Sequence, residues 1–232
     1  VDTAWEIAYD QFVLPASGKV WNGKPSEAGK TTFEVDENTG ALKSLCLDGE
    51  ELLASPVTIS LFRPATDNDN RDRMGAKLWR KAGLHTLTQK VVSLKESKTS
   101  ATAQVNILNV TGKKVGDATL EYTLNHNGSL KVQTTFQPDT TWVKSIARLG
   151  LTFEMNDTYG NVTYLGRGEH ETYIDRNQSG KIGIYTTTPE KMFHYYVIPQ
   201  STGNRTDVRW VKLADDSGKG CWIESDSPFQ FS

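Results

Sequence analysis

Two short polar segments carry the side chains that could do acid–base chemistry on a sugar or hold a metal. In the first, Glu169 and Glu171 flank His170. A glycosidase uses two carboxyl groups that face each other across the scissile bond, roughly 5–5.5 Å apart in a retaining enzyme. Two glutamates at i and i+2 could lie on one side of a strand, but nothing marks either as buried or perturbed. We therefore predict no catalytic residue here, and His170 also lacks the second histidine of a helical zinc site.

The second segment contains Asp67, Asp69 and Asp72, which have the residue type of a calcium loop but not its spacing. An EF-hand loop needs ligands at positions 1, 3 and 5 and a glutamate at position 12. Counting from Asp67, position 5 is an arginine and position 12 is a leucine. We predict no metal site, and instead a turn whose carboxylates cap backbone amides and pair with Arg63 or Arg71.

Histidine and tryptophan supply the remaining candidates. His194 lies among aromatic residues, where a histidine is more often packed with one satisfied nitrogen than catalytic. Trp79, Trp142 and Trp210 could stack on sugar rings, but packing is the more frequent role of an indole. The sequence contains no nucleophile elbow, no P-loop and no dinucleotide-binding glycine pattern after a strand.

Two glycine-punctuated stretches, 164–176 and 203–210, mix arginines, carboxylates, amides and aromatic residues. A solvated turn needs only glycine, asparagine, aspartate and serine. The arginines and aromatic residues therefore indicate either internal arginine–carboxylate pairs or a surface that meets a ligand. We predict both stretches as loops on either side of a strand at 181–187.

The elements that must position these residues are strands. Period-two alternation gives several segments one apolar and one polar face, as in antiparallel sheets with one side in water. The strands are predicted at 31–35, 42–47, 57–62, 102–107, 118–125, 130–137, 144–155 and 181–187. Asn127-Gly128 predicts a tight hairpin turn, and about two helical turns are expected within 74–82. Strands at this spacing with almost no helix indicate a sandwich or barrel.

Composition excludes several functional classes. The chain has 232 residues, 37% of them hydrophobic, and a formal net charge of −2, which suits one large all-β domain or two small ones. Near-neutral charge argues against binding to nucleic acid or to an anionic membrane. No apolar run approaches the roughly 20 residues of a membrane span. Cys46 and Cys221 make no disulfide framework and are expected to fill apolar space.

Three motifs follow one another along the chain. The first is Leu61-Phe-Arg-Pro-Ala-Thr-Asp-Asn-Asp69, followed by Trp-Arg-Lys-Ala-Gly at 79–83. The second, at 164–176, has the pattern Tyr-x-Gly-x-Gly-x-x-Glu-x-Tyr-x-Asp-Arg, and the third is Tyr-Val-Ile-Pro-Gln at 196–200 with Gly-Asn-Arg at 203–205. Together they resemble the carboxy-terminal domain of the large β-galactosidases of the lac-operon type, in glycoside hydrolase family 2. Ile-Ala-Arg-Leu-Gly at 146–150 also resembles a strand of that family.

The resemblance implies an all-β fold, an antiparallel β-supersandwich of the galactose mutarotase type. It would occupy residues 30–232 and be incomplete at its C-terminal end. Residues 1–15 would end a preceding immunoglobulin-like domain, and residues 16–29 would be a linker. The compartment of the parent enzyme is left open between the bacterial cytoplasm and the bacterial periplasm.

The resemblance also implies the partners and cofactors. Both catalytic glutamates would lie on an upstream TIM barrel, which would be this domain's main partner. A galactoside substrate would be bound through the parent enzyme, which could be a homo-oligomer. Magnesium and sodium ions are used by this family at sites elsewhere, so no cofactor is expected in this chain.

For the site, the resemblance implies no catalytic residue but two other sets. The rim of the substrate pocket would be formed by Asp67, Asn68, Asp69 and Asn70, with the loop from Asn70 to Lys77 at the mouth of the active site. The residues that would order the loops are Arg63, Arg167, Glu171, Tyr173, Asp175, Arg176, Gln200 and Arg205.

The leading hypothesis is therefore a non-catalytic β-galactosidase domain that is inactive alone. Two alternatives remain. The first is a stand-alone, mutarotase-like sugar epimerase, which would need His170 or His194 to converge with a glutamate base on one pocket. The second is a carbohydrate-binding module that uses an exposed aromatic side chain.

Overall fold

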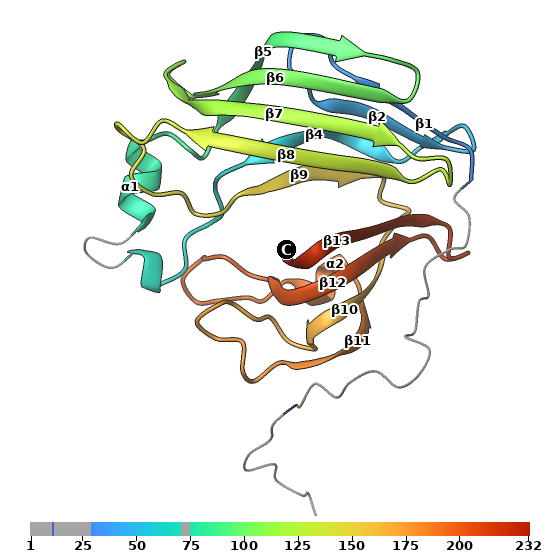
Figure 1. Ribbon diagram of the computed structural model, residues 1–232. Helices are drawn as coiled ribbons and strands as arrows, with labels where there is room; N and C mark the ends of the chain where they lie inside the picture. Colours follow the sequence, from blue (N-terminus) through green and yellow to red (C-terminus); the bar gives the residue numbers. More distant parts are fainter. Residues whose placement is uncertain (1–10, 12–28, 71–74) are drawn as a thin grey trace, which may run out of the picture. The chain divides into compact units, whose positions relative to one another are not determined.

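The computed structural model describes residues 11, 29–70 and 75–232, and most of their regular structure is antiparallel strand (Figure 1). The strands are β1 (Thr31–Val35), β2 (Leu42–Leu47), β3 (Glu50–Glu51), β4 (Leu53–Ser60), β5 (Leu87–Glu96), β6 (Ser100–Asn109), β7 (Lys114–Leu124), β8 (Leu130–Pro138), β9 (Gly150–Met155), β10 (Asn161–Gly168), β11 (Lys181–Thr187), β12 (Arg205–Ala214) and β13 (Gly220–Phe231). The helical segments are η1 (Asn68–Asn70), α1 (Gly75–Lys81) and α2 (Pro189–Met192). The predicted all-β, antiparallel sandwich class is confirmed.

The chain divides into two compact units. The sandwich unit contains β1 to β9, within 26–159, together with 195–201. The sheet unit contains β10 to β13, within 160–194 and 202–232, together with Gln11. The predicted segments 1–15 and 16–29 lie outside the described residues except for Gln11 and Gly29. In the sheet unit, the Gln11 carboxamide pairs with the backbone of Ile182, accepting from N at 2.6 Å and donating to O at 3.2 Å.

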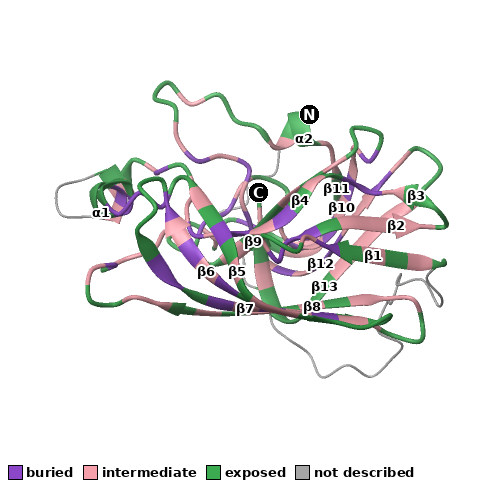
Figure 2. Cartoon of the chain, turned by 90° about the horizontal axis from the view of Figure 1, so that it is seen from above, coloured by how far each residue is buried: buried purple, intermediate pink, exposed green. Residues whose placement is uncertain are grey.

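The sandwich unit consists of two antiparallel sheets that enclose one core. Their strand orders are β1-β2-β4-β9, with β3 paired to β2, and β5-β6-β7-β8. Along β6 and β7 buried side chains alternate with exposed or half-buried ones (Figure 2). The predicted period-two pattern is thus confirmed at its clearest point. Polar groups also tie the interior together: the buried Gln89 accepts from Ile59 N at 2.7 Å and donates to Thr39 O at 3.0 Å.

Two predictions about the sandwich strands were wrong. No strand was predicted at 87–96, where β5 lies; its alternation is masked because polar Gln89 points inward and the register shifts between Val91 and Ser93. The predicted strand 144–155 begins only at Gly150. Before it, Ala147 donates to the Leu61 carbonyl at 3.2 Å in an irregular connection.

The sheet unit is a single four-stranded sheet in the order β11-β10-β12-β13. The predicted loops at 164–176 and 203–210 were therefore wrong in part, because Tyr164–Gly168 and Arg205–Trp210 belong to the two central strands. The misleading signal was glycine. A Cβ at Gly166 would lie 2.8 Å from the Val208 side chain, and one at Gly168 would lie 2.4 Å from the Tyr164 hydroxyl oxygen. These glycines permit close packing inside a strand rather than a turn.

The predicted short helix is confirmed as α1, which buries Trp79 against the sandwich core. The Trp79 indole N–H donates to Ser145 Oγ at 3.0 Å. The Asn127-Gly128 turn is also confirmed between β7 and β8, with Gly128 at φ +80°. None of the helices in the described part of the chain is long and apolar enough to cross a membrane.

Thr134 on the edge strand β8 offers a stability test. Its hydroxyl is buried and has no hydrogen-bond partner within the described structure. An unsatisfied buried hydroxyl costs about 1–3 kcal/mol, so Thr134→Val, which keeps the shape, should stabilise the sandwich unit by about 1 kcal/mol in urea unfolding. The matched control is Thr135→Val on the exposed face of the same strand. A loss of stability in Thr134→Val, with Thr135→Val neutral, would contradict this assignment.

Candidate functional site

The turn that follows β4 is organised by the carboxylate of Asp69. This carboxylate accepts from Arg63 Nη1 at 2.6 Å and Nη2 at 3.3 Å, and from Thr66 N at 2.7 Å and Oγ1 at 2.8 Å. The Asp69 side chain is only 17% exposed. The predicted turn, in which a carboxylate caps a backbone amide and pairs with Arg63, is what the structure contains. Asp69 therefore points into the turn, unlike its neighbours in the predicted rim.

The other three residues of the predicted rim are exposed. Asp67, Asn68 and Asn70 lie at the surface of η1 and the residue before it. Asn70 donates to Thr66 O at 3.2 Å and accepts from Arg80 at 3.2 Å. Residues 71–74 of the predicted mouth loop lie outside the described residues. The turn thus exposes one carboxylate and two side-chain amides. Its backbone is held by the Asp69 carboxylate, which accepts from Thr66 N.

Gln200 holds the same turn from a distant part of the sequence. Its side-chain Oε1 accepts from Asp67 N at 3.1 Å, and Ser201 N donates to Ala65 O at 3.3 Å. Arg63 also lies over the Trp79 ring, 5.5 Å from its centroid. Two residues of the predicted loop-ordering set, Arg63 and Gln200, therefore contact the turn directly.

The pH dependence of the Asp69 interactions can be tested. Burial raises the pKa of Asp69, but hydrogen bonds from Arg63 and Thr66 and the charge of Arg63 outweigh it, so the pKa is lowered overall. A carboxylate with a lowered folded-state pKa contributes stability above its unfolded value, about 3.9, and loses it as pH falls through the folded value. We expect Asp69→Asn to cost about 2 kcal/mol at pH 7 and to flatten the loss of stability below about pH 4. Unfolding free energies from pH 2 to 7 would measure this, and an unchanged acid slope would contradict it.

In the sheet unit, Glu171 joins the loop after β10 to the segment before β12. It accepts from Arg176 Nη2 at 2.7 Å, from Gly203 N at 3.0 Å and from Thr202 Oγ1 at 3.3 Å. Its side chain is only 10% exposed. This carboxylate is therefore engaged by hydrogen bonds from within the sheet unit.

Thr172, which sequence reasoning missed, continues this junction. It is fully buried, and its hydroxyl accepts from Thr206 N at 3.0 Å and pairs with the Thr206 hydroxyl at 2.9 Å. Asn204 adds a donor to the Thr172 carbonyl at 2.7 Å. No local signal could have found these contacts, because threonine is common at exposed strand positions in this sequence.

Two arginines of the predicted set are anchored in the same unit. Arg205 is 3% exposed and donates through Nε to the Tyr164 hydroxyl at 2.8 Å and through Nη1 to Gly203 O at 3.0 Å. Burial chiefly raises the pKa of Tyr164, although Arg205 opposes this, so its hydroxyl stays protonated. Arg167 forms an ion pair with Asp207 and donates to Gly180 O at 2.9 Å.

The remaining residues of the predicted loop-ordering set lie in one turn. Backbone bonds between Tyr173 and Arg176 close it, at 3.1 and 2.9 Å. Tyr173 is buried, and the Arg176 guanidinium lies 5.8 Å from the centroid of its ring. Asp175 is exposed at the tip of the turn. Each of the three therefore lies in a turn that Glu171 holds through Arg176.

Neither of the two histidines that a sugar epimerase could use is enclosed within the described part of the chain. His170 is exposed, with Nε2 2.9 Å from Ser179 Oγ. His194 is exposed too, and its backbone N donates to Thr202 Oγ1 at 2.7 Å. A groove of about 310 Å³ lies in the sandwich unit, but no histidine lines it. Its lining is Phe33, Glu34, Val35, Lys43, Glu96, Ser97, Lys98 and Ala101.

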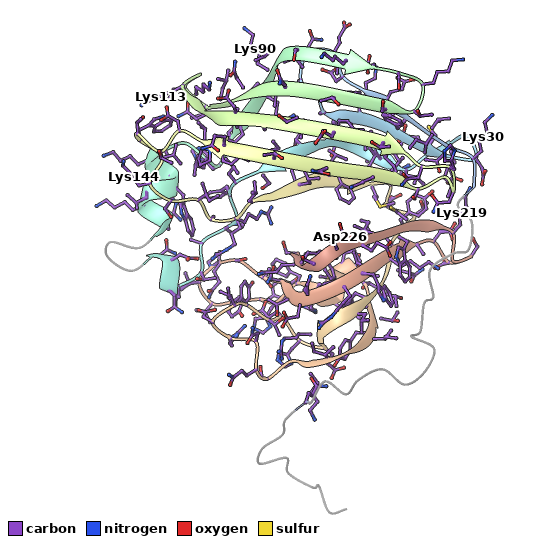
Figure 3. The ribbon with its side chains drawn as sticks, in the orientation of Figure 1. Lys30, Lys90, Lys113, Lys144, Lys219 and Asp226 are labelled. Carbon is purple, nitrogen blue, oxygen red and sulfur yellow. The ribbon has the colours of Figure 1, made fainter. Side chains whose placement is uncertain are left out.

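The three tryptophans considered for sugar stacking have packing roles. Trp79 is 5% exposed, and Trp210 is 6% exposed and stacks on Trp222 with ring centroids 4.3 Å apart. Lys113, labelled in Figure 3, lies with Nζ 3.9 Å from the centroid of Trp142. Trp142 is also partly buried against the sandwich core, so each of the three rings takes part in packing.

The fold, the Asp69 turn and the Glu171 junction define an all-β, antiparallel protein of the sandwich class whose polar turns are ordered by internal arginine and carboxylate contacts. The chain belongs to the beta galactosidase small chain family, whose family model matches residues 27–232.

Curated relatives agree with this membership. A β-galactosidase of Priestia megaterium is 30% identical over an alignment of 250 positions that covers 96% of this chain and 23% of that enzyme. The β-galactosidase of Kluyveromyces lactis is 28% identical, with 97% of this chain and 24% of that enzyme covered. β-Galactosidase BgaC of Bifidobacterium adolescentis is 27% identical, and the alignment covers 94% of this chain and 21% of that enzyme. The chain thus spans about a quarter of the length of these relatives, consistent with a domain of a larger enzyme.

Proposed function

We propose that this chain is a non-catalytic domain of an enzyme that hydrolyses terminal β-galactosides. A retaining β-galactosidase needs two carboxyl groups facing one glycosidic bond. In this chain the most enclosed candidate, Glu171, is bound by Arg176, Thr202 and Gly203. Its neighbour Glu169 is exposed. The observation that carries the proposal is coverage: the chain matches only 23% of a β-galactosidase that it matches over 96% of its own length.

The contribution of the domain would be the turn at 67–70, as part of the rim of the substrate pocket. Asp67, Asn68 and Asn70 expose one carboxylate and two amides, groups that can accept and donate hydrogen bonds to sugar hydroxyls. Arg63 and Gln200 hold the turn through Asp69 and the Asp67 backbone. A turn ordered in this way loses little entropy when it meets a substrate.

The rim assignment is tested in the complete parent enzyme. Asp67→Ala with Asn68→Ala should raise KM for a galactoside roughly tenfold and leave kcat nearly unchanged, because the lost contacts are made equally in ground and transition states. The matched control is Asp157→Ala, at an exposed turn of the same unit. An unchanged KM would remove the turn from the rim.

The non-catalytic assignment is tested with the 232-residue chain alone. Incubated with a chromogenic β-galactoside, it should release no chromophore above the buffer blank. Hydrolysis at a rate that matches an intact β-galactosidase would overturn the proposal.

A further inference from the structure

The groove of about 310 Å³ in the sandwich unit lies between the two sheets of that unit, at one side of the sandwich. Its lining comes from β1 and β2 of one sheet, and from β5, the turn after it and β6 of the other. β1 and β5 are edge strands of their sheets (Figure 1). The groove is therefore formed within one unit, and its volume is near the lower end of the roughly 300–1,000 Å³ of ligand pockets.

The groove combines apolar and charged side chains. Val35 and Ala101 are buried, at 7% and 2% exposed, and Phe33 is partly buried with its ring centroid 6.3 Å from that of Tyr122. The other lining side chains are polar and include two anions and two cations, all of them exposed: Glu34, Glu96, Lys43 and Lys98. A ligand that fits this lining has an apolar group with charges of both signs beside it.

The backbone of Phe33 adds hydrogen-bonding groups beside the groove. Phe33 lies opposite Leu45 in the ladder between β1 and β2. Leu45 N donates to Glu51 Oε1 at 2.9 Å, and the Leu45 carbonyl accepts from Leu52 N at 2.9 Å. Because both backbone groups of Leu45 turn away from Phe33, the two residues form a non-hydrogen-bonded pair. The N–H and C=O of Phe33 therefore point to the outer side of β1, where no strand of the described chain lies.

We infer that the groove and the outer edge of β1 form a binding site for an extended peptide, which adds to β1 as an antiparallel strand. An exposed strand edge binds a peptide through main-chain hydrogen bonds, and a pocket beside it selects alternate side chains. The peptide residue paired with Phe33 has its side chain on the same face as the Phe33 ring, and so enters the groove. The inference goes beyond the proposed function and does not depend on it.

The charges of the groove define the composition of the peptide. The peptide residue next to the one paired with Phe33 lies opposite Glu34 and points to the opposite face, where a lysine forms a cross-strand pair of opposite charge. Glu34 is 68% exposed and lies 3.2 Å from Lys43 Nζ, so a carboxylate further along the peptide complements the cations. A neutral sugar offers no charge to this lining, and a peptide of one sign is repelled by half of it. The partner is an extended segment that alternates apolar residues with charges of both signs.

The test measures binding of a fluorescein-labelled peptide, Thr-Val-Lys-Leu-Glu-Val-Thr with blocked ends, to the 232-residue chain by fluorescence anisotropy. With its central leucine opposite Phe33, the peptide places its lysine opposite Glu34. The titration should saturate, and hydrogen exchange at the Phe33 amide should slow when the peptide is bound. A peptide with N-methyl-leucine at the centre keeps the side chain but lacks the N–H that the Phe33 carbonyl would accept, so its Kd should be at least about tenfold higher.

A charge exchange tests the position of the peptide on β1. Glu34→Lys should raise the Kd about fivefold, and a peptide with its lysine and glutamate exchanged should bind this variant about as tightly as the first peptide binds wild type. The variant should fold normally because the Glu34 side chain is largely exposed. The matched control is Glu154→Lys, which makes the same change at an exposed residue of β9, the other edge strand of the same sheet, and should leave the Kd unchanged.

Three results would overturn the inference. The first is the absence of saturable binding at millimolar peptide. The second is equal affinity for the N-methylated peptide, because the strand edge then takes no part. The third is self-association of the chain in sedimentation that Glu34→Lys abolishes while the peptide does not bind, because the occupant is then a second copy.

Discussion

Gly40→Ala should destabilise the sandwich unit by about 3 kcal/mol, the sum of a strained backbone and an overfilled core. Gly40 has φ +70°, in the left-handed region that favours glycine. An added Cβ would lie 2.7 Å from the Ala103 Cβ and 2.9 Å from the Val105 Cγ1. Neither neighbour can move away easily, since both are at most 1% exposed in the core strand β6.

The clash would also reach a buried hydrogen bond. The Tyr122 hydroxyl donates to the Gly40 carbonyl at 2.9 Å, so a displaced turn would leave a fully buried phenol without its acceptor. Urea unfolding measures the loss. The matched control is Gly49→Ala, where φ is +84° and no heavy atom lies within 4 Å of the added Cβ; it should cost only about 1 kcal/mol. Equal losses in the two variants would show that backbone strain alone, and not core packing, requires Gly40.

Arg205→Met should destabilise the sheet unit by about 3 kcal/mol, a loss typical of removing one partner of a buried charged network. The replacement keeps much of the apolar stem but deletes the guanidinium. It would leave the Tyr164 hydroxyl and the Gly203 carbonyl without their present donor. Tyr164 lies within β10 and Gly203 lies just before β12, both in the sheet unit, so the loss should appear as earlier unfolding of that unit.

A double-mutant cycle separates the hydrogen bond from general packing. Tyr164→Phe removes only the hydroxyl, and its coupling with Arg205→Met should be about 1–2 kcal/mol. Lys191→Met is the matched control, because it makes the same change from a cation to a thioether at an exposed residue of the same unit. Additive losses at Tyr164 and Arg205 would contradict a direct interaction between them.

The prediction of the fold from sequence succeeded where one face of a strand is buried and the other is wet. Along β6 and β7 the side-chain alternation is nearly complete, and a one-residue slip would bury the wrong face. Prediction failed where the interior takes a polar side chain, as at Gln89 in β5, and where glycines lie within strands, as at Gly166 and Gly168. In those strands the deciding contacts come from neighbouring strands, which local composition does not reveal.

The candidate site shows the same division. The motif around Asp69 predicted a turn with a carboxylate paired to Arg63, because both partners lie within six residues of each other. Sequence alone did not show that Gln200 would hold Asp67, from 133 residues away, or that Arg205 would bind the Tyr164 hydroxyl, from 41 residues away. Such contacts depend on which strands become neighbours.

By itself, the sequence determined that this protein is an antiparallel β domain of the β-galactosidase type, because hydrophobic periodicity and closely spaced motifs are local properties. Only the tertiary structure decided which polar side chains form hydrogen bonds inside the protein and which face solvent. Asp69 and Glu171 accept hydrogen bonds from arginines and backbone amides, whereas Asp67 and Glu169 remain exposed. That choice belongs to the folded chain, since a side chain is buried or exposed only through the segments that pack around it.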